Sequence, residues 1–216
     1  MLRFLFCQNI AKVKIMLYNI FMEYILASAS PRRIELFKEI SKDFTVLPAD
    51  VDESIEKLFD KKELDSLLNS SPQSIVMELA KIKAMAIASN HPNSLVVGAD
   101  TGVFLDGKML GKPVDKEDAI RLLKMLSGKT HHVITGFCIM YKDKIITDFE
   151  NTIVVFENLD DFAIDRYIKS GQYKGKAGAY GIQDGYGLVK EYIGDLNNVI
   201  GFPTEKIKKR IKEVLE

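Results

Sequence analysis

The stretch Tyr24-Ile-Leu-Ala-Ser-Ala-Ser-Pro-Arg-Arg33 predicts a strand that runs directly into a helix. Its first four residues form an apolar run typical of a buried strand. Ser30 is a natural N-cap, and Pro31 suits the first helical position, where its missing N–H costs nothing. Arg32 and Arg33 then oppose the positive end of the helix dipole, where acidic residues are usual. The helix therefore begins with an unusual charge.

An anion bound at this helix start would explain the two arginines. Free N–H groups, hydroxyls and guanidinium groups bind phosphate together. We therefore interpret Ser28, Ser30, Arg32 and Arg33 as a phosphate-binding cradle. A solvated basic turn is the alternative interpretation.

The composition is typical of a globular, soluble protein: 216 residues, 47% hydrophobic and 28% charged. Thirty basic and thirty acidic side chains cancel, which argues against a nucleic-acid-binding surface. The two cysteines are too few for a disulfide framework, and the three histidines do not have the spacing of a zinc site. We expect a cytoplasmic protein that acts on a small molecule.

Residues 1–21 are expected to be an extension outside the core. Their apolar runs are interrupted and do not reach the length of about 18 residues that a membrane span needs. A small-residue cleavage site typical of a signal peptide is also missing. A translation start at Met22 is the simplest explanation, and a peripheral amphipathic anchor is the alternative. We expect residues 22–216 to form one domain.

Strand-like and helix-like patterns alternate along the chain. The predicted strands cover residues 24–27, 44–47, 95–99, 103–105, 108–110, 130–141, 144–156 and 188–193. The predicted helices cover residues 31–40, 73–89, 116–127, 160–170 and 203–215, and a glycine-rich loop covers 175–187. The turn at Asp106-Gly107 predicts a hairpin. This order predicts an α/β fold with a mixed sheet.

Two charged residues interrupt apolar patterns. Lys83 lies at the centre of the apolar face of its predicted helix, so it needs a carboxylate, a phosphate or a cleft to avoid desolvation of its charge. A lysine whose stem covers apolar surface while its ammonium reaches water is the alternative. Asp100 follows the apolar run 95–99, and we expect it at the carboxyl edge of that strand, where open α/β sheets bind ligands. An ordinary turn aspartate is the alternative.

Further polar residues fit a site for a metal and phosphates. Asp100 could bind a divalent cation or activate a water, and Glu53 offers a second carboxylate after an earlier strand. Mg²⁺ prefers carboxylate, phosphate and water oxygens. Lys112 adds a cation on a turn. In the glycine-rich loop, the amide of Gln183 has the donor and acceptor that the edge of uracil or thymine requires, although such loops are common.

The chain resembles the Maf family of septum-formation inhibitor-like nucleotide pyrophosphatases over residues 22–215. The segments that carry the resemblance, in the order that the family has them, are Leu26-Ala-Ser-Ala-Ser-Pro-Arg-Arg33, Asp52-Glu53, Ala80-Lys-Ile-Lys-Ala84, Gly98-Ala-Asp-Thr101, Gly111-Lys-Pro113, Leu126-Ser-Gly-Lys-Thr-His131, Ala177-Gly-Ala-Tyr-Gly-Ile-Gln183 and Val199-Ile-Gly-Phe-Pro203.

The resemblance implies an elongated Maf and ITPase-like α/β fold with a cleft between two lobes, often as a homodimer. It implies hydrolysis of dTTP and UTP to the monophosphate and pyrophosphate, with Mg²⁺ or Mn²⁺ as cofactor. Asp100 takes the proton-acceptor position, Ser28, Arg33, Glu53, Lys83 and Lys112 match substrate or metal positions, and Arg32, Thr101 and Gln183 match positions of base selectivity. The alternatives are a 7-methyl-GTP pyrophosphatase and a non-catalytic nucleotide-binding regulator of cell division.

Overall fold

A computed structural model describes residues 22–51 and 71–216 of the chain. The expected extension (residues 1–21) and Glu53 lie outside these residues. The strands are β1 (Tyr24–Leu26), β2 (Thr45–Val46), β3 (Leu95–Leu105), β4 (Lys108–Leu110), β5 (Thr130–Tyr141), β6 (Lys144–Phe156) and β7 (Val189–Ile193). The helices are α2 (Pro31–Phe37), α5 (Pro72–Ala88), α6 (Lys116–Leu126), α7 (Asp161–Lys169), α8 (Leu196–Ile200) and α9 (Thr204–Leu215), with 3₁₀ turns η1 (Ala177–Ala179) and η2 (Ile182–Asp184).

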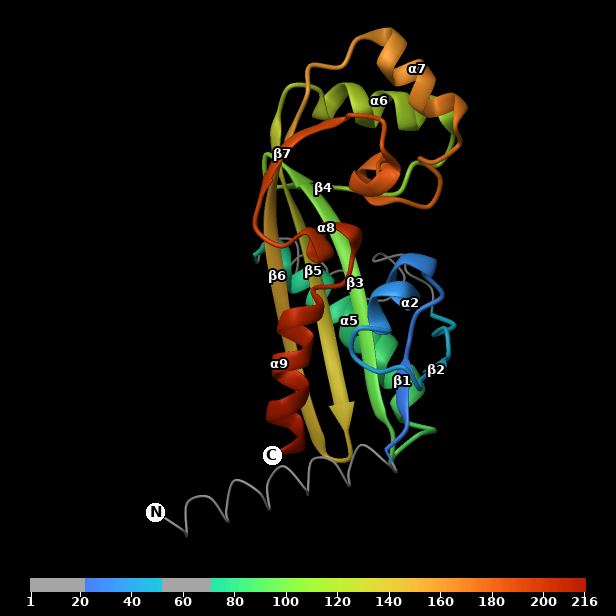
Figure 1. Ribbon diagram of the computed structural model, residues 1–216, viewed down its shortest axis with the longest axis vertical. Helices are drawn as coiled ribbons and strands as arrows, with labels where there is room; N and C mark the ends of the chain where they lie inside the picture. The colour runs from blue at the N-terminus through green and yellow to red at the C-terminus, as the bar shows by residue number, and fades with distance from the viewer. Residues whose placement is uncertain (1–21, 52–70) are drawn as a thin grey trace, which may run out of the picture.

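The strands form one mixed sheet in the order β2-β1-β3-β5-β6-β7, with β4 added to β3. The pairs β2–β1 and β1–β3 are parallel, and the other pairs are antiparallel. Together with the helices on its faces, the sheet gives the elongated molecule of Figure 1. The predicted mixed-sheet α/β class is therefore confirmed.

The two edges of β3 differ. One edge pairs with β5 from Val96 to Phe104. The other edge pairs with β1 at the beginning of β3 and with β4 at its end. Among the strands that the structure describes, none pairs with this second edge between Gly98 and Gly102. The sheet thus has a gap on this side, and the gap separates two lobes.

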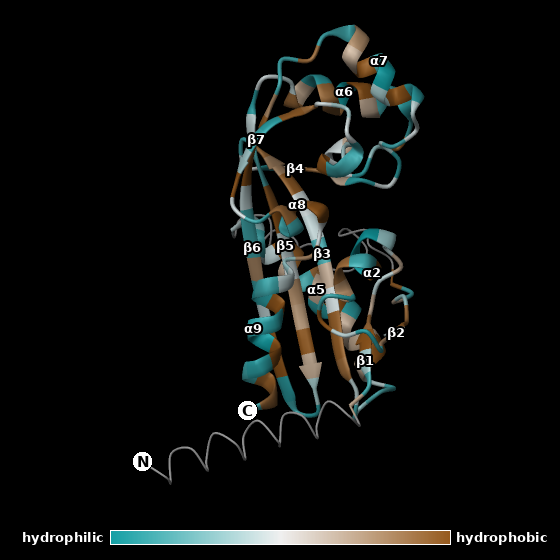
Figure 2. Cartoon of the chain, viewed as in Figure 1, coloured by the Kyte–Doolittle hydropathy of each residue, from teal (hydrophilic) through white to brown (hydrophobic). Residues whose placement is uncertain are grey.

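Alternating side chains of the strands build a core on each face of the first lobe. Leu95 and Val97 of β3 pack with residues of α2 and α9, and Figure 1 shows α9 along the front of the sheet. Val96 packs on the opposite face with Ala80 and Ala84 of α5. Figure 2 shows the corresponding alternation of apolar and polar residues on α9. Each face of the sheet is covered because its residues are apolar on both sides.

The second lobe is built on the far ends of the long strands. Val103 and Leu105 of β3 and Phe156 of β6 pack there against α6, α7 and η1. The helices α6 and α7 lie together at this end of the molecule, away from α2, α5 and α9 (Figure 1). None of the helices in the described ranges has the length and apolar character needed to cross a membrane.

Three details differ from the sequence prediction, and one is the end of α2, which lies at Phe37 rather than at Ile40. The expected end of the third strand at Ala99 is wrong, since β3 continues to Leu105 and Asp100 lies in its middle rather than at a carboxyl edge. Asp100 and Thr101 are compatible with a strand because each has a polar partner: Asp100 binds Lys83, and the hydroxyl of Thr101 accepts from Arg33. The helix α8 was not expected, because five residues are too few for a helical period to be visible.

The helix α5 lies very close to the sheet, because two glycines face it. A Cβ at Gly98 would lie 2.4 Å from the carbonyl oxygen of Ala80, and a Cβ at Gly136 would lie 2.5 Å from the backbone nitrogen of Met77. Both contacts are with backbone atoms, which cannot turn away as a flexible side chain can. The two glycines, on β3 and β5, therefore set the distance between α5 and the sheet, and with it the position of Lys83.

We predict that Gly98→Ala lowers the free energy of unfolding by about 2 kcal/mol or more, because the helix must move away from the sheet. Urea denaturation measures this loss. Gly111→Ala is the matched control: nothing in the described residues lies within 4 Å of its added Cβ, so a change below about 0.5 kcal/mol is expected. Equal stability of the two variants would contradict the prediction.

Candidate active site

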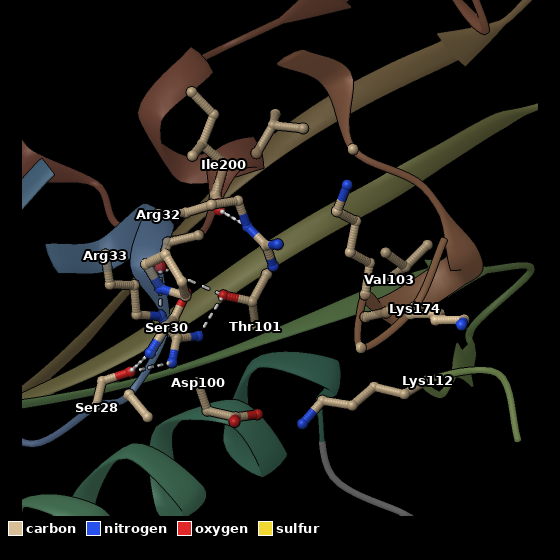
Figure 3. Close-up of a pocket in the computed structure, with 18 of the residues that line it drawn as sticks. Ser28, Ser30, Arg32, Arg33, Asp100, Thr101, Val103, Lys112, Lys174 and Ile200 are labelled. Carbon is tan, nitrogen blue, oxygen red and sulfur yellow. Dashed lines mark hydrogen bonds between the residues drawn. The ribbon is translucent and has the colours of Figure 1, made fainter. Parts of the chain in front are cut away.

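A cavity of about 620 Å³ lies at the gap in the sheet, between the two lobes. Its walls come from the beginning of α2, the middle of β3, the turn after β4, the loop 171–183 and the end of α8. The structure places nine predicted site residues on these walls: Ser28, Ser30, Arg32, Arg33, Lys83, Asp100, Thr101, Lys112 and Gln183. Their chemical roles stay predictions. Figure 3 shows most of them converging on one space.

The beginning of α2 is built as the sequence predicts, except at its cap. Ser30 occupies the N-cap position and Pro31 follows as the first helical residue. The Ser30 hydroxyl makes no capping hydrogen bond to any described residue, so the predicted side-chain cap is wrong. Its backbone N–H donates instead to the hydroxyl of Ser28 at 3.3 Å. The Ser30 hydroxyl is therefore not used to cap the helix, and Ser30 lines the cavity.

Arg33 joins three segments of the chain. Its Nε donates to the carbonyl oxygen of Gly201 at 2.9 Å, and its Nη1 donates to the carbonyl oxygen of Ala99 at 2.8 Å. Its Nη1 and Nη2 also donate to the hydroxyls of Ser28 and Thr101, at 3.4 and 3.0 Å. The carbonyl of Ala99 lies in the unpaired edge of β3, so Arg33 supplies the donor that a neighbouring strand would supply. This structural role was not visible in the sequence.

Arg32 lies beside Arg33 and makes fewer hydrogen bonds to the described residues. Its Nε donates to the carbonyl oxygen of Ile200 at 3.4 Å. Figure 3 shows its guanidinium group extending over the cavity near Thr101. Both arginines therefore rest on the end of α8, which explains why this short helix matters for the site.

The ammonium group of Lys83 binds the carboxylate of Asp100 at 2.6 Å. The two side chains are only 7% and 13% exposed. The sequence predicts that a lysine at the centre of an apolar helix face requires a carboxylate, a phosphate or a cleft, and this prediction is confirmed. The pair places opposite charges on the floor of the cavity, with Oδ1 of Asp100 held by the lysine.

A buried network holds Thr101. Its hydroxyl lies 3.0 Å from the hydroxyl of Thr135, which donates to the carbonyl oxygen of Asn198. The amide of Asn198 donates to the carbonyl oxygen of Val133 and to the hydroxyl of Thr152, each at 2.9 Å. Asn198 therefore attaches α8 to β5 and β6. Sequence reasoning missed it, since nothing in the local pattern tells which strands an isolated asparagine contacts.

A second buried ion pair supports the glycine-rich loop. Lys176 binds Asp184 at 2.5 Å, and their side chains are 7% and 6% exposed. The hydroxyl of Tyr167 in α7 donates to the same carboxylate at 2.6 Å and accepts the N–H of Gly181 at 3.2 Å. Burial first, and then the bond to Asp184, raises the pKa of Tyr167 above its usual value. Sequence reasoning missed this cluster as well.

His131 lies behind the cavity wall. Its Nε2 is 2.7 Å from the hydroxyl of Tyr180, a wall residue, and its Nδ1 has no hydrogen-bond partner among the described residues. Burial first, and then the charge of His132, lowers the pKa of His131 to about 4. The imidazole is therefore neutral at pH 7, and it supports Tyr180 without adding charge to the site.

The described residues contain no group of three or more side chains that could hold a metal by themselves. Asp100 is the only carboxylate among the described wall residues. Mg²⁺ in nucleotide enzymes is commonly bound by one or two carboxylates together with substrate phosphates and water. Of such a set, the described wall residues supply one carboxylate, Asp100.

We predict that Lys83→Met lowers the free energy of unfolding by about 3 kcal/mol, because the carboxylate of Asp100 loses its buried partner. The double variant Lys83→Met/Asp100→Asn recovers most of this loss, since no buried charge is left. Urea denaturation of both single variants and the double variant measures the coupling. Strictly additive effects would contradict the prediction.

We predict that His131 makes the protein less stable in mild acid. Between pH 6.5 and 4 the unfolded chain binds a proton that the folded chain does not, so the free energy of unfolding falls as the pH falls. From pH 7 to 4.5 this contribution is about 2 to 3 kcal/mol. Urea denaturation at both pH values should show a smaller decline for His131→Gln than for the parent. The exposed neighbour provides the control: His132→Gln keeps most of the decline, because burial is the larger cause of the lowered pKa of His131. Equal declines in all three proteins would refute the assignment.

Comparison with known proteins identifies the family of the chain. The sequence model of the Maf-like protein family matches residues 23–214. A dTTP/UTP pyrophosphatase of Thermococcus gammatolerans is 44% identical over 186 residues, which are 86% of this chain and 93% of the relative. The dTTP/UTP pyrophosphatases of Thermosipho africanus and Bacillus mycoides are 44% and 41% identical, over 86% and 88% of this chain and 90% and 94% of the relatives. The resemblance that the motifs predict is confirmed, and the chain belongs to the Maf family.

Proposed function

We propose that this chain is a pyrophosphatase that hydrolyses dTTP and UTP to the nucleoside monophosphate and pyrophosphate. The observation that carries the proposal is the convergence of Arg32, Lys83 and Lys112 with Asp100 in one cavity. The names of the relatives support the choice of substrates. The volume of about 620 Å³ lies in the usual range for small-molecule sites.

The cations provide the binding energy for the phosphates. Lys112 and Arg32 approach the cavity from opposite lobes, so they can hold different parts of a triphosphate (Figure 3). Each charge-assisted hydrogen bond contributes about 1.5 to 3 kcal/mol. Contacts that strengthen as charge develops on the leaving pyrophosphate lower the barrier rather than only the dissociation constant.

Asp100 is the group that we assign to the attacking water. Lys83 holds its Oδ1, which fixes the carboxylate and leaves Oδ2 for the water. The water gives a proton to Asp100 and its oxygen forms a bond to the α-phosphorus. The bond from this phosphorus to the bridging oxygen breaks, and pyrophosphate leaves with the electron pair. General-base catalysis of this type contributes about 10²- to 10⁴-fold.

A divalent cation completes the proposal. Mg²⁺, or Mn²⁺ in its place, would be held by Asp100, by the substrate phosphates and by Glu53, which lies outside the described residues. When bound, it would neutralise part of the phosphate charge. Removal of divalent cations with EDTA is expected to stop turnover.

The base would lie against the glycine-rich loop. Gln183 and Thr101 line the same cavity, and the Gln183 amide offers the donor and acceptor that match uracil and thymine. We place the reaction in the cytoplasm, where nucleoside triphosphates are made and used.

We predict that the protein incubated with UTP and Mg²⁺ in H₂¹⁸O releases UMP that carries the label, together with unlabelled pyrophosphate. Asp100→Asn should lower kcat by about 10³-fold, because the water loses its base. Mass spectrometry identifies the products and a pyrophosphate assay measures the rate. Asp165→Asn is the control, since Asp165 pairs with Lys169 on the surface of α7.

Two results would overturn the proposal. Release of UDP and inorganic phosphate would mean that a different phosphorus is attacked. Full activity of Asp100→Asn would mean that Asp100 is not the base.

A further inference from the structure

The amide of Gln183 raises a problem of selectivity that its own chemistry does not solve. An amide oxygen and nitrogen have nearly the same shape, so a glutamine that turns over exchanges its donor and acceptor. Uracil presents an N–H beside a carbonyl oxygen, whereas cytosine presents an acceptor nitrogen beside an amino group. A freely turning Gln183 would bind both bases. Discrimination between them requires a group that fixes the amide in one orientation.

The carboxylate of Asp184 lies on the same side of Gly181 as the amide of Gln183. A Cβ built on Gly181 would lie 2.8 Å from both carboxylate oxygens of Asp184 and 2.9 Å from Nε2 of Gln183. The carboxylate and the amide nitrogen therefore lie on the same face of Gly181, although no hydrogen bond joins these two described side chains, so the carboxylate acts on the amide through its charge. Because a carboxylate accepts hydrogen bonds and repels an amide oxygen, it favours the orientation in which the nitrogen of Gln183 lies toward it.

Asp184 is itself held firmly. Lys176 and the hydroxyl of Tyr167 both bind its Oδ2, at 2.5 and 2.6 Å. Tyr167 also accepts the N–H of Gly181, so one phenol connects the carboxylate to the backbone that it contacts. The side chain of Asp184 is 6% exposed. A buried carboxylate held by two hydrogen-bond partners gives its neighbour a directional field rather than a mobile charge.

We propose that the charge of Asp184, which Lys176 and Tyr167 hold in place, orients the amide of Gln183 with its nitrogen toward the carboxylate and thereby makes the site prefer uracil and thymine over cytosine. This inference rests on the proposed function. Asp184 does not touch the reacting phosphates, so it is a positioning residue for base selectivity. The phosphate-binding part of the cavity should not depend on it.

The test compares base discrimination with phosphate binding in the same variants. Competing UTP and CTP give the ratio of their kcat/KM values, and inorganic tripolyphosphate, which has no base, measures inhibition through the phosphate subsites alone. Asp184→Asn keeps the shape and removes the charge. Tyr167→Phe keeps the ion pair and removes the hydroxyl. Tyr173→Phe is the matched control, because Tyr173 belongs to the same core and its hydroxyl makes no hydrogen bond to a described residue.

We expect the UTP-to-CTP ratio to fall about tenfold in Asp184→Asn and about fivefold in Tyr167→Phe, with KM for UTP rising and kcat within about twofold. The inhibition constant of tripolyphosphate should change less than twofold in both, and Tyr173→Phe should match the parent in every measurement.

A ratio equal to that of the parent in the two folded variants would overturn the inference. A parallel loss of tripolyphosphate inhibition would also overturn it, since the whole site would then be disturbed. If thermal denaturation shows that both variants are unfolded, the cluster is a folding element and the inference falls. If the parent protein hydrolyses neither UTP nor CTP, the proposed function fails and this inference fails with it.

Discussion

The backbone of β3 must satisfy its polar groups where no neighbouring strand reaches it, and this requirement shapes the cavity. β1 and β4 occupy the two ends of one edge of β3, and Ala99 lies between them. An unpaired buried carbonyl costs about 1 to 3 kcal/mol. Arg33 supplies the missing donor and also binds Gly201. The same guanidinium therefore closes the edge of the sheet and holds the beginning of α2 beside the end of α8 at the cavity.

The charges in the cavity are divided by function. Lys83 and Asp100 form a compact pair on the floor, where α5 is held close by Gly98. Arg32 lies above Asp100 and Lys112 lies beside it, and the two cations belong to different lobes (Figure 3). A pair fixed before substrate arrives needs little rearrangement during reaction, which is the arrangement that electrostatic catalysis requires. The buried pair of the second lobe, at Lys176, belongs to the loop and not to this floor.

Local patterns predicted the fold well where the elements are long. The expected hairpin strands Thr130–Tyr141 and Lys144–Phe156 agree with β5 and β6, because alternation over many residues and a clear turn leave one interpretation. The residues of the cavity were found from chemical anomalies, such as a lysine on an apolar face. Their partners were not: Asn198 contacts strands more than forty residues away, and Asp184 meets Tyr167 of another helix. Side-chain contacts between residues so far apart in the sequence depend on the fold, so local sequence patterns do not predict them.

The lobes are joined by continuous strands rather than by a linker. β3, β5 and β6 run from one lobe into the other, hydrogen-bonded to one another along the way (Figure 1). A flexible hinge would let the halves swing apart at small cost, but a three-stranded ribbon resists bending across its hydrogen bonds. The softest deformation of such a ribbon is a change in its twist. Entry of a nucleotide and exit of its products must therefore be coupled to twisting of the sheet. The stiffness of the three strands limits how widely the cavity between the lobes can open.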